Sequence, residues 1–407
     1  MIFIILNILK LIVFDENAIS NILIICFLTL LININYNKAK ILILLSELSF
    51  GVPLIIDSIS SIYSFNYDII LNCHICTLVG VFIYLSFFDN KKNVINYEIK
   101  KDVSNKFINN IILFSFIVSI TADVLGISKM GIENDIVLPF KLKGLINYLH
   151  FEVIPFLYLI IVDNSRKKYI YIFILVWATY ESILRGSRGF FVTFMAQVLV
   201  IYNIRNKITK NIYKPFIKYL PIAILIILFF TVKRYELTLA DLMSNYELLI
   251  KFLNLIYNRV FSICLNSSEM ITYFNNYPTG LIDIINQGSF SMFNTNIIGN
   301  LEAIKETHSS GSSYYAEFYF FFGYYGVVFG AMILSYYIFN LRNTISANSI
   351  RVYFDFFVVF QFLNGGLITL LFFRPERIII IVFLFIIYNF LIKIGTISKK
   401  NSHEHSY

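Results

Sequence analysis

Two arginines lie in a short polar turn, Arg185-Gly186-Ser187-Arg188-Gly189, between two apolar runs that are each about as long as a bilayer core. A charged side chain at membrane depth costs roughly 3 kcal/mol or more unless it is paired or faces water, so it indicates a function by default. The two glycines let the chain turn sharply, and the first amides of a helix that opens at Gly189 are a natural anion site. The turn is therefore the first candidate for binding an anionic ligand.

The two arginines of this turn differ in their sequence neighbours. Glu181 precedes Arg185 by four residues, so the pair shares a helix face and Glu181 is expected to neutralise Arg185 near the membrane edge. Arg188 has no acidic partner nearby in the sequence. Arg188 is therefore the stronger candidate for ligand binding, with contact to lipid headgroups as the alternative.

Ionisable side chains around the later apolar runs could join the same chemistry. Glu317 lies just inside an apolar run, where a carboxylate is costly, so it either pairs with an arginine, which is the first expectation, or acts in catalysis. His308 lies in the preceding polar segment and could act as a base near neutral pH, although a loop histidine without a role is the commoner case. The other cationic candidates are Arg234, Arg259, Arg374 and Arg377.

The composition predicts a membrane protein. Of the 407 residues, 58% are hydrophobic and only 14% are charged, which excludes a soluble globular protein. The net charge of +8 is attributed to basic cytoplasmic loops and not to nucleic-acid binding. The first run resembles a signal peptide without a cleavage site, so it is counted as a membrane segment.

The apolar runs predict an all-α polytopic membrane protein with about twelve transmembrane helices. About nine helices fall in residues 1–232, a large outer loop spans 233–314, about three helices fall in 315–394, and 395–407 form a cytoplasmic tail. Within the loop, three- and four-residue spacing predicts an amphipathic helix over 239–260, and residues 275–280 have the composition of a turn. The runs lie at 2–14, 18–36, 41–57, 69–88, 107–126, 146–162, 169–185, 189–204, 216–232, 315–340, 353–373 and 377–394.

The loop charges orient these helices. The lysine-rich loops all fall on one side, which the positive-inside rule assigns to the cytoplasm together with both termini. The outer portions carry six arginines against six lysines, whereas the cytoplasmic portions carry four arginines against seventeen lysines. Because arginine binds phosphate at two points, this asymmetry indicates a phosphorylated ligand at the outer leaflet.

A CxxC spacing at Cys73 and Cys76 lies inside an apolar run and has no second ligand pair. It is interpreted as two buried thiols beside a membrane-facing histidine, His74. No metal site and no cofactor are expected.

The layout resembles the O-antigen polymerase (Wzy) family of bacterial envelope biogenesis. The resemblance rests on about twelve spans, a long outer loop, the GSRG turn at 186–189 and the stretch AEFYFFFGYYG at 316–326. It implies a polymerase in the bacterial inner membrane that joins undecaprenyl-pyrophosphate-linked oligosaccharide repeat units at the periplasmic face. Matching positions are Arg188, Arg234, Arg259, Glu317, Tyr319, Gly323 and Gly326.

This reading gives each candidate a role. A hydroxyl of the incoming repeat unit attacks C1 of the growing glycan, and undecaprenyl pyrophosphate leaves with increasing negative charge. Arg188, Arg234 and Arg259 are expected to stabilise that charge, and Glu317 or His308 to assist deprotonation. Arg185, Arg374, Arg377 and Tyr319 are candidate substrate-binding residues. Membrane lipid, a chain-length regulator and a flippase are further candidate partners.

Two other functions share this layout. A lipid-linked oligosaccharide flippase also has about twelve spans and basic cavity residues, but the outer gathering of arginines and the long loop favour an enzyme. An O-antigen ligase would use the same donor and differ in its acceptor. A membrane acyltransferase is disfavoured because no span carries a central histidine beside a catalytic acid.

Overall fold

A computed structural model describes the chain in separate stretches, and every regular element in them is a helix. No strand occurs in these stretches. Two compact units are formed, and each is described by itself. Apart from a few isolated positions, the described residues are 2–13, 16–36, 39–60, 66–88, 105–124, 149–164, 168–185, 188–206, 266–287, 313–341 and 349–356.

By length and composition alone, three helices in these stretches could cross a membrane, namely Ala18–Asn35, Tyr67–Phe88 and Tyr314–Asn340, of which the last is broken at Gly323. This confirms the helical, membrane-type character predicted from the apolar runs. Shorter apolar helices cover Leu42–Ile56, Ile108–Ala122, Ile154–Asn164, Tyr169–Glu181 and Thr193–Ile204. The predicted run at 216–232, the amphipathic helix at 239–260 and most of the last two runs lie outside the described residues.

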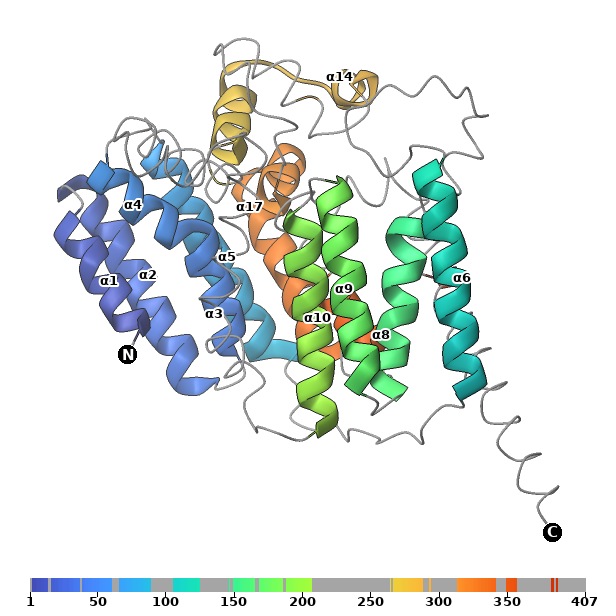
Figure 1. Cartoon of the computed structure of the whole chain (residues 1–407). Coiled ribbons are helices and arrows are strands. Elements are labelled where there is room, and N and C mark those ends of the chain that lie inside the picture. Colours follow the sequence, from blue (N-terminus) through green and yellow to red (C-terminus); the bar gives the residue numbers. More distant parts are fainter. Residues whose placement is uncertain are drawn as a thin grey trace, which may run out of the picture. The chain divides into compact units, whose positions relative to one another are not determined.

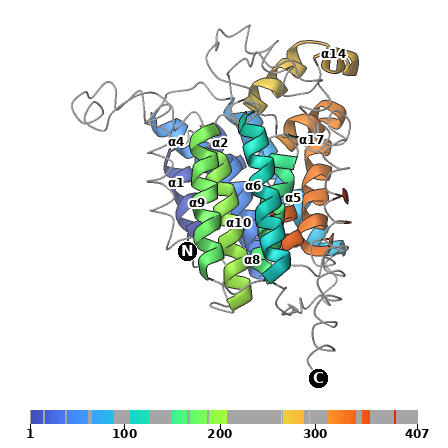
Figure 2. The ribbon, with the colours of Figure 1, turned by 45° about the vertical axis from the view of Figure 1, so that its right-hand side comes forward.

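The first unit contains residues Met1–Val94, Ile250–Thr344 and Phe357–Ile378. Its centre is the packing of α5 against α17, which run side by side in both views (Figures 1 and 2). At this contact the backbone carbonyl of Val328 lies so close to Gly80 that a side chain there would collide with it. The helices of this unit are α1 (Ile2–Val13), α2 (Glu16–Asn35), α3 (Lys40–Ser46), the π-helix η2 (Glu47–Gly51), α4 (Val52–Ser60), α5 (Tyr67–Phe88), residues 266–276, α14 (Leu281–Asn286), α17 (Tyr314–Tyr336) and the π-helix η5 (Tyr337–Leu341).

The second unit contains residues Ile95–Leu249, Ile345–Phe356 and Ile379–Tyr407. In it α8 packs against α9 and α10, and α6 packs against α8 (Figure 1). Aromatic rings fill its interior, with Trp177 in edge contact with Tyr158 at 4.6 Å and with Phe194 at 5.6 Å between ring centroids. The helices are α6 (Asn105–Val124), the π-helix η3 (Leu149–Val153), α8 (Ile154–Asn164), α9 (Lys168–Arg185), α10 (Arg188–Asn206) and residues 349–356.

The length of the apolar run at 315–340 predicted one straight helix, but the structure shows a break within it. Gly323 has φ 59° and ψ −147°, a conformation that other residues rarely adopt, and it breaks α17 into two segments. The segments fold back on each other, because Gly326 packs against the backbone carbonyl of Phe318 and the rings of Tyr319 and Tyr324 lie 5.0 Å apart. The stretch AEFYFFFGYYG is thus a helical hairpin.

Gly323→Ala is expected to destabilise the protein by about 1–3 kcal/mol, because alanine at this φ and ψ is strained. The measurement is the thermal unfolding temperature of the purified chain in detergent. Gly280→Ala is the matched control, since Gly280 has φ −90° and a side chain there meets nothing closer than 3.5 Å. Equal unfolding temperatures for the two variants would contradict the assigned hairpin.

Candidate functional site

The arginine turn lies between two helices, as its sequence predicted. Helix α9 ends at Arg185 and α10 begins at Arg188. The first amides of α10 lie at the positive end of the helix dipole, which favours an anion. The side chains of both arginines, and the residues Gly186 and Ser187 between them, lie outside the described residues.

One turn before Arg185, a buried histidine and glutamate contact each other. Nε2 of His150 lies 2.9 Å from Oε2 of Glu181, and both side chains are fully buried. Glu181 is on α9, and His150 is in the π-helix η3 that opens α8. We refer to this pair as the His150–Glu181 dyad. The expected pairing of Glu181 with Arg185 stays a prediction.

The dyad has the geometry of an acid–base group. A carboxylate that binds one ring nitrogen of a histidine fixes the orientation of the ring and stabilises the imidazolium that forms when the other nitrogen takes a proton. A buried setting strengthens this bond. In the nearby apolar core, Trp177 links α9 to α6, because its Nε1 donates to Oγ of Ser119 at 3.3 Å. The dyad therefore pairs an imidazole with a carboxylate that orients it.

Glu317 and Tyr319 both lie in the first segment of the α17 hairpin, in the first unit. Glu317 is fully buried, and its expected pairing with an arginine stays a prediction. The hydroxyl of Tyr319 donates to Oδ1 of Asn275 at 2.7 Å, which ties the hairpin to the end of the helix over 266–276. That helix ends at Asn276, so the first two residues of the turn predicted at 275–280 are helical and the other four connect it to α14.

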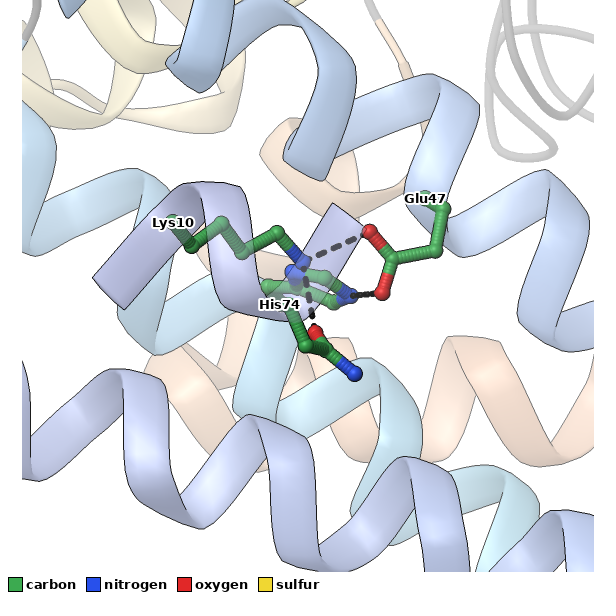
Figure 3. A network of polar contacts seen from close by, with 4 residues as sticks. Lys10, Glu47 and His74 are labelled. Carbon is green, nitrogen blue, oxygen red and sulfur yellow. Dashed lines mark hydrogen bonds and ion pairs between the residues drawn. The ribbon is translucent and has the colours of Figure 1, made fainter. Parts of the chain in front are cut away.

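A second buried polar group joins three helices of the first unit (Figure 3). Nζ of Lys10, on α1, lies 2.6 Å from Oε2 of Glu47 in η2 and donates to Oδ1 of Asn7 at 3.4 Å. Nε2 of His74, on α5, lies 3.9 Å from Oε1 of Glu47. The side chains of Lys10, Glu47 and His74 are fully buried, and we call them the Lys10–Glu47–His74 network.

This network corrects the prediction that His74 faces the membrane. Its ring is enclosed, and it stacks on Phe50 with 5.4 Å between ring centroids and an interplanar angle of 17°. An imidazole inside the protein avoids the cost of facing hydrocarbon, because a carboxylate and an aromatic ring lie beside it. Cys73 is buried and Cys76 is half-buried, and both are free thiols.

The local backbone around Glu47 makes room for this network. In η2 the amide of Val52 bonds the carbonyl of Glu47, so the turn is one residue wider than in an α-helix. Gly51 lies directly against the charged pair, because a side chain at this position would overlap Oε2 of Glu47 and approach Nζ of Lys10 to 2.9 Å.

Gly51→Ala is expected to destabilise the protein by about 1–3 kcal/mol, since the added methyl group overpacks the charged pair. Gly51→Ala combined with Glu47→Ala should lose less stability than the sum of the two single changes, because the second change removes the overlapping atom. Unfolding of the four proteins in detergent measures this difference. Strict additivity would contradict the assigned contact.

Five of the predicted site residues lie outside the described residues, namely Arg234, Arg259, His308, Arg374 and Arg377. Of the others, Arg185 and Arg188 flank one turn in the second unit, and Glu317 and Tyr319 share one helical segment in the first. His150 as a partner of Glu181, and Lys10 and Glu47, were not predicted from the sequence. Each is an ionisable residue within an apolar run, which is the signal that could have identified it.

Comparison of the chain with protein-family models, with curated proteins and with solved structures finds no match.

Proposed function

We propose that this chain is a membrane glycosyltransferase that polymerises surface polysaccharide from undecaprenyl-pyrophosphate-linked oligosaccharide repeat units. One observation carries the proposal: the helix that ends at Arg185, next to the turn to Arg188, holds a buried glutamate bonded to a histidine. Glycosyl transfer from a pyrophosphate requires cations at the leaving group and a base at the acceptor. This end of α9 has residues suited to both tasks.

The proposed reaction makes one bond and breaks one. The oxygen of an acceptor hydroxyl on the incoming repeat unit bonds to C1 of the sugar at the reducing end of the growing glycan. The bond from C1 to the pyrophosphate oxygen breaks, and undecaprenyl pyrophosphate leaves with the electron pair. The proton of the hydroxyl passes to the base, so atoms and charge balance without a cofactor.

The residues are assigned to these steps. Arg188, together with Arg234 and Arg259, stabilises the charge that grows on the pyrophosphate, and each such donor is worth about 10²- to 10³-fold in rate. His150 takes the acceptor proton and Glu181 stabilises the imidazolium, in the role that the sequence predicts for Glu317 or His308. The reaction is proposed to take place at the periplasmic face of a bacterial inner membrane, with both termini in the cytoplasm.

Deletion of the gene tests this function in the cell. A polymerase mutant is expected to accumulate lipid-linked single repeat units on the outer leaflet, and its lipopolysaccharide is expected to carry one repeat on the lipid A core. The readout is the lipopolysaccharide profile together with the leaflet that holds the glycolipid. A deletion strain with an unchanged polysaccharide ladder would overturn the proposal.

The Lys10–Glu47–His74 network favours a second candidate, a lipid-linked oligosaccharide flippase. Buried intramembrane lysine, glutamate and histidine residues occur along ion and proton pathways in transporters. Loss of a flippase would leave the single repeat units on the inner leaflet, so the same deletion strain separates the two functions. A ligase would show full-length glycan that remains on undecaprenyl pyrophosphate.

A further inference from the structure

The Lys10–Glu47–His74 network presents one carboxylate to two bases on different helices. Oε2 of Glu47 lies 2.6 Å from the ammonium of Lys10, and Oε1 lies 3.9 Å from Nε2 of His74 (Figure 3). Each oxygen therefore faces its own base. The polymerisation proposed above uses none of these residues.

The local structure is adapted to hold this arrangement. The π-helix η2 widens the backbone at Glu47, Gly51 leaves space for the carboxylate, and Phe50 stacks on the imidazole ring. Single π-helical turns are frequent at functional sites. Replacing a buried ion pair by apolar side chains is often neutral or stabilising, so the presence of the network is weak evidence for a purely stabilising role.

The network also has unused hydrogen-bonding capacity. Within the described part of the chain, neither ring nitrogen of His74 forms a hydrogen bond, and Oε1 of Glu47 accepts none. Oε1 lies about one ångström beyond hydrogen-bonding distance from Nε2. A small rotation of either side chain would close this gap.

Charge balance limits what the network can hold. With His74 neutral, the Lys10 ammonium and the Glu47 carboxylate sum to zero, and an additional buried charge would be strongly disfavoured. The same balance holds if Lys10 is a neutral amine and His74 is an imidazolium. The carboxylate can thus be neutralised by a proton on either base, but not on both.

The other titratable groups around the network do not change this balance. Cys26 on α2 lies near Lys10 and Glu47, Cys73 and Cys76 flank His74 on α5, and Tyr315 on α17 packs on Phe50 at 4.8 Å. Thiols and phenols are uncharged at neutral pH at their ordinary pKa values. A small cavity lined in part by Ser46, Ser49 and Thr77 lies beside Phe50 and has room for about one water molecule.

We propose that the Lys10–Glu47–His74 network is a proton-exchange site. The carboxylate of Glu47 is paired with one protonated base at a time, either the Lys10 ammonium at Oε2 or the His74 imidazolium at Oε1. In the exchange, water delivers a proton to His74, and the new N–H bonds Oε1. Lys10 gives one N–H proton to water and becomes a neutral amine. One proton enters and one leaves, so the buried charge is unchanged.

Lys10→Met tests this proposal by removing one of the two bases while keeping an apolar stem of similar length. The experiment is solid-state ¹⁵N NMR of the full chain in lipid bilayers with labelled histidine. The chain has five histidines, so the His74 signals are assigned by their loss in His74→Gln. The expected result is a neutral imidazole in the wild-type protein and an imidazolium in Lys10→Met, with a neutral ring again in Lys10→Met combined with Glu47→Gln.

A neutral His74 in folded Lys10→Met, with Glu47 observed as a protonated acid by infrared spectroscopy, would overturn the proposal. If Lys10→Met does not yield folded protein, the protonation state of Lys10 is measured instead in Glu47→Gln by the same NMR experiment with labelled lysine. Without the carboxylate, Lys10 should lose its charge, and a Lys10 ammonium that persists would contradict the assigned charge balance. Neither readout depends on glycan synthesis, so a failure here is distinct from a failure of the proposed polymerase.

Discussion

Arg188→Lys is expected to lower the rate of glycan polymerisation by about 10²- to 10³-fold, the effect of losing one donor to a developing anion. Lysine keeps the positive charge and loses the planar fork that bonds two phosphate oxygens at once. The rate is measured as repeat units joined per minute by membranes that carry equal amounts of each protein.

Arg205→Lys is the matched control, because Arg205 lies in the last turn of the same helix, α10. The same substitution there should leave the rate within a factor of two, which corresponds to about 0.4 kcal/mol in the activation barrier. A full-length polysaccharide ladder from Arg188→Lys would remove Arg188 from the reaction.

His150→Gln is expected to lower the polymerisation rate by about 10²- to 10⁴-fold, the contribution of a general base. Glu181→Gln should lower it by a similar order, because the amide cannot stabilise an imidazolium at 2.9 Å from Nε2. Since the two residues act as a unit, the double variant should be no slower than the slower single variant. The measurement is again the rate of repeat-unit joining.

Ser119→Ala is the control for a buried polar change in the same unit, since it removes the acceptor of the Trp177 hydrogen bond and leaves the dyad intact. It should affect the unfolding temperature more than the rate. If His150→Gln and Ser119→Ala lowered the rate equally, the dyad would be structural and would not act as a base.

The helices of the described region could be predicted well from apolar runs, because a helix in lipid must be long, continuous and apolar. The run at 169–185 corresponds to α9 at Lys168–Arg185, and the run at 189–204 to α10 at Arg188–Asn206. The polar turn between them interrupts hydrophobicity, which places the helix ends within a residue or two.

Backbone irregularities inside the runs could not be predicted in the same way. The run at 41–57 was interpreted as one regular span, and the structure forms it as one continuous helical stretch in which the π-helix η2 lies between α3 and α4. A π-helix arises from how a turn packs against its neighbours, and it has no hydrophobic period of its own. Gly323 was visible in the run at 315–340, but a glycine within a membrane helix is common and does not by itself predict a reversal.

The candidate site could be predicted in part. The arginines flanking the turn follow from the cost of charge at membrane depth, whereas Glu181 was expected only to neutralise Arg185. The partner of Glu181 did not follow, because His150 is distant in the sequence and the contact depends on which helices pack together. For the same reason the sequence does not predict that Lys10, Glu47 and His74, which lie in separate runs, come together.

The most direct test of the proposed function is synthesis by the purified chain alone. The protein is reconstituted into liposomes that contain one undecaprenyl-pyrophosphate-linked repeat unit, and the glycan products and free undecaprenyl pyrophosphate are measured. A polymerase should form glycans of two or more repeats and release one undecaprenyl pyrophosphate for each bond made. Repeat units that cross the bilayer and stay single would contradict the account and identify a flippase.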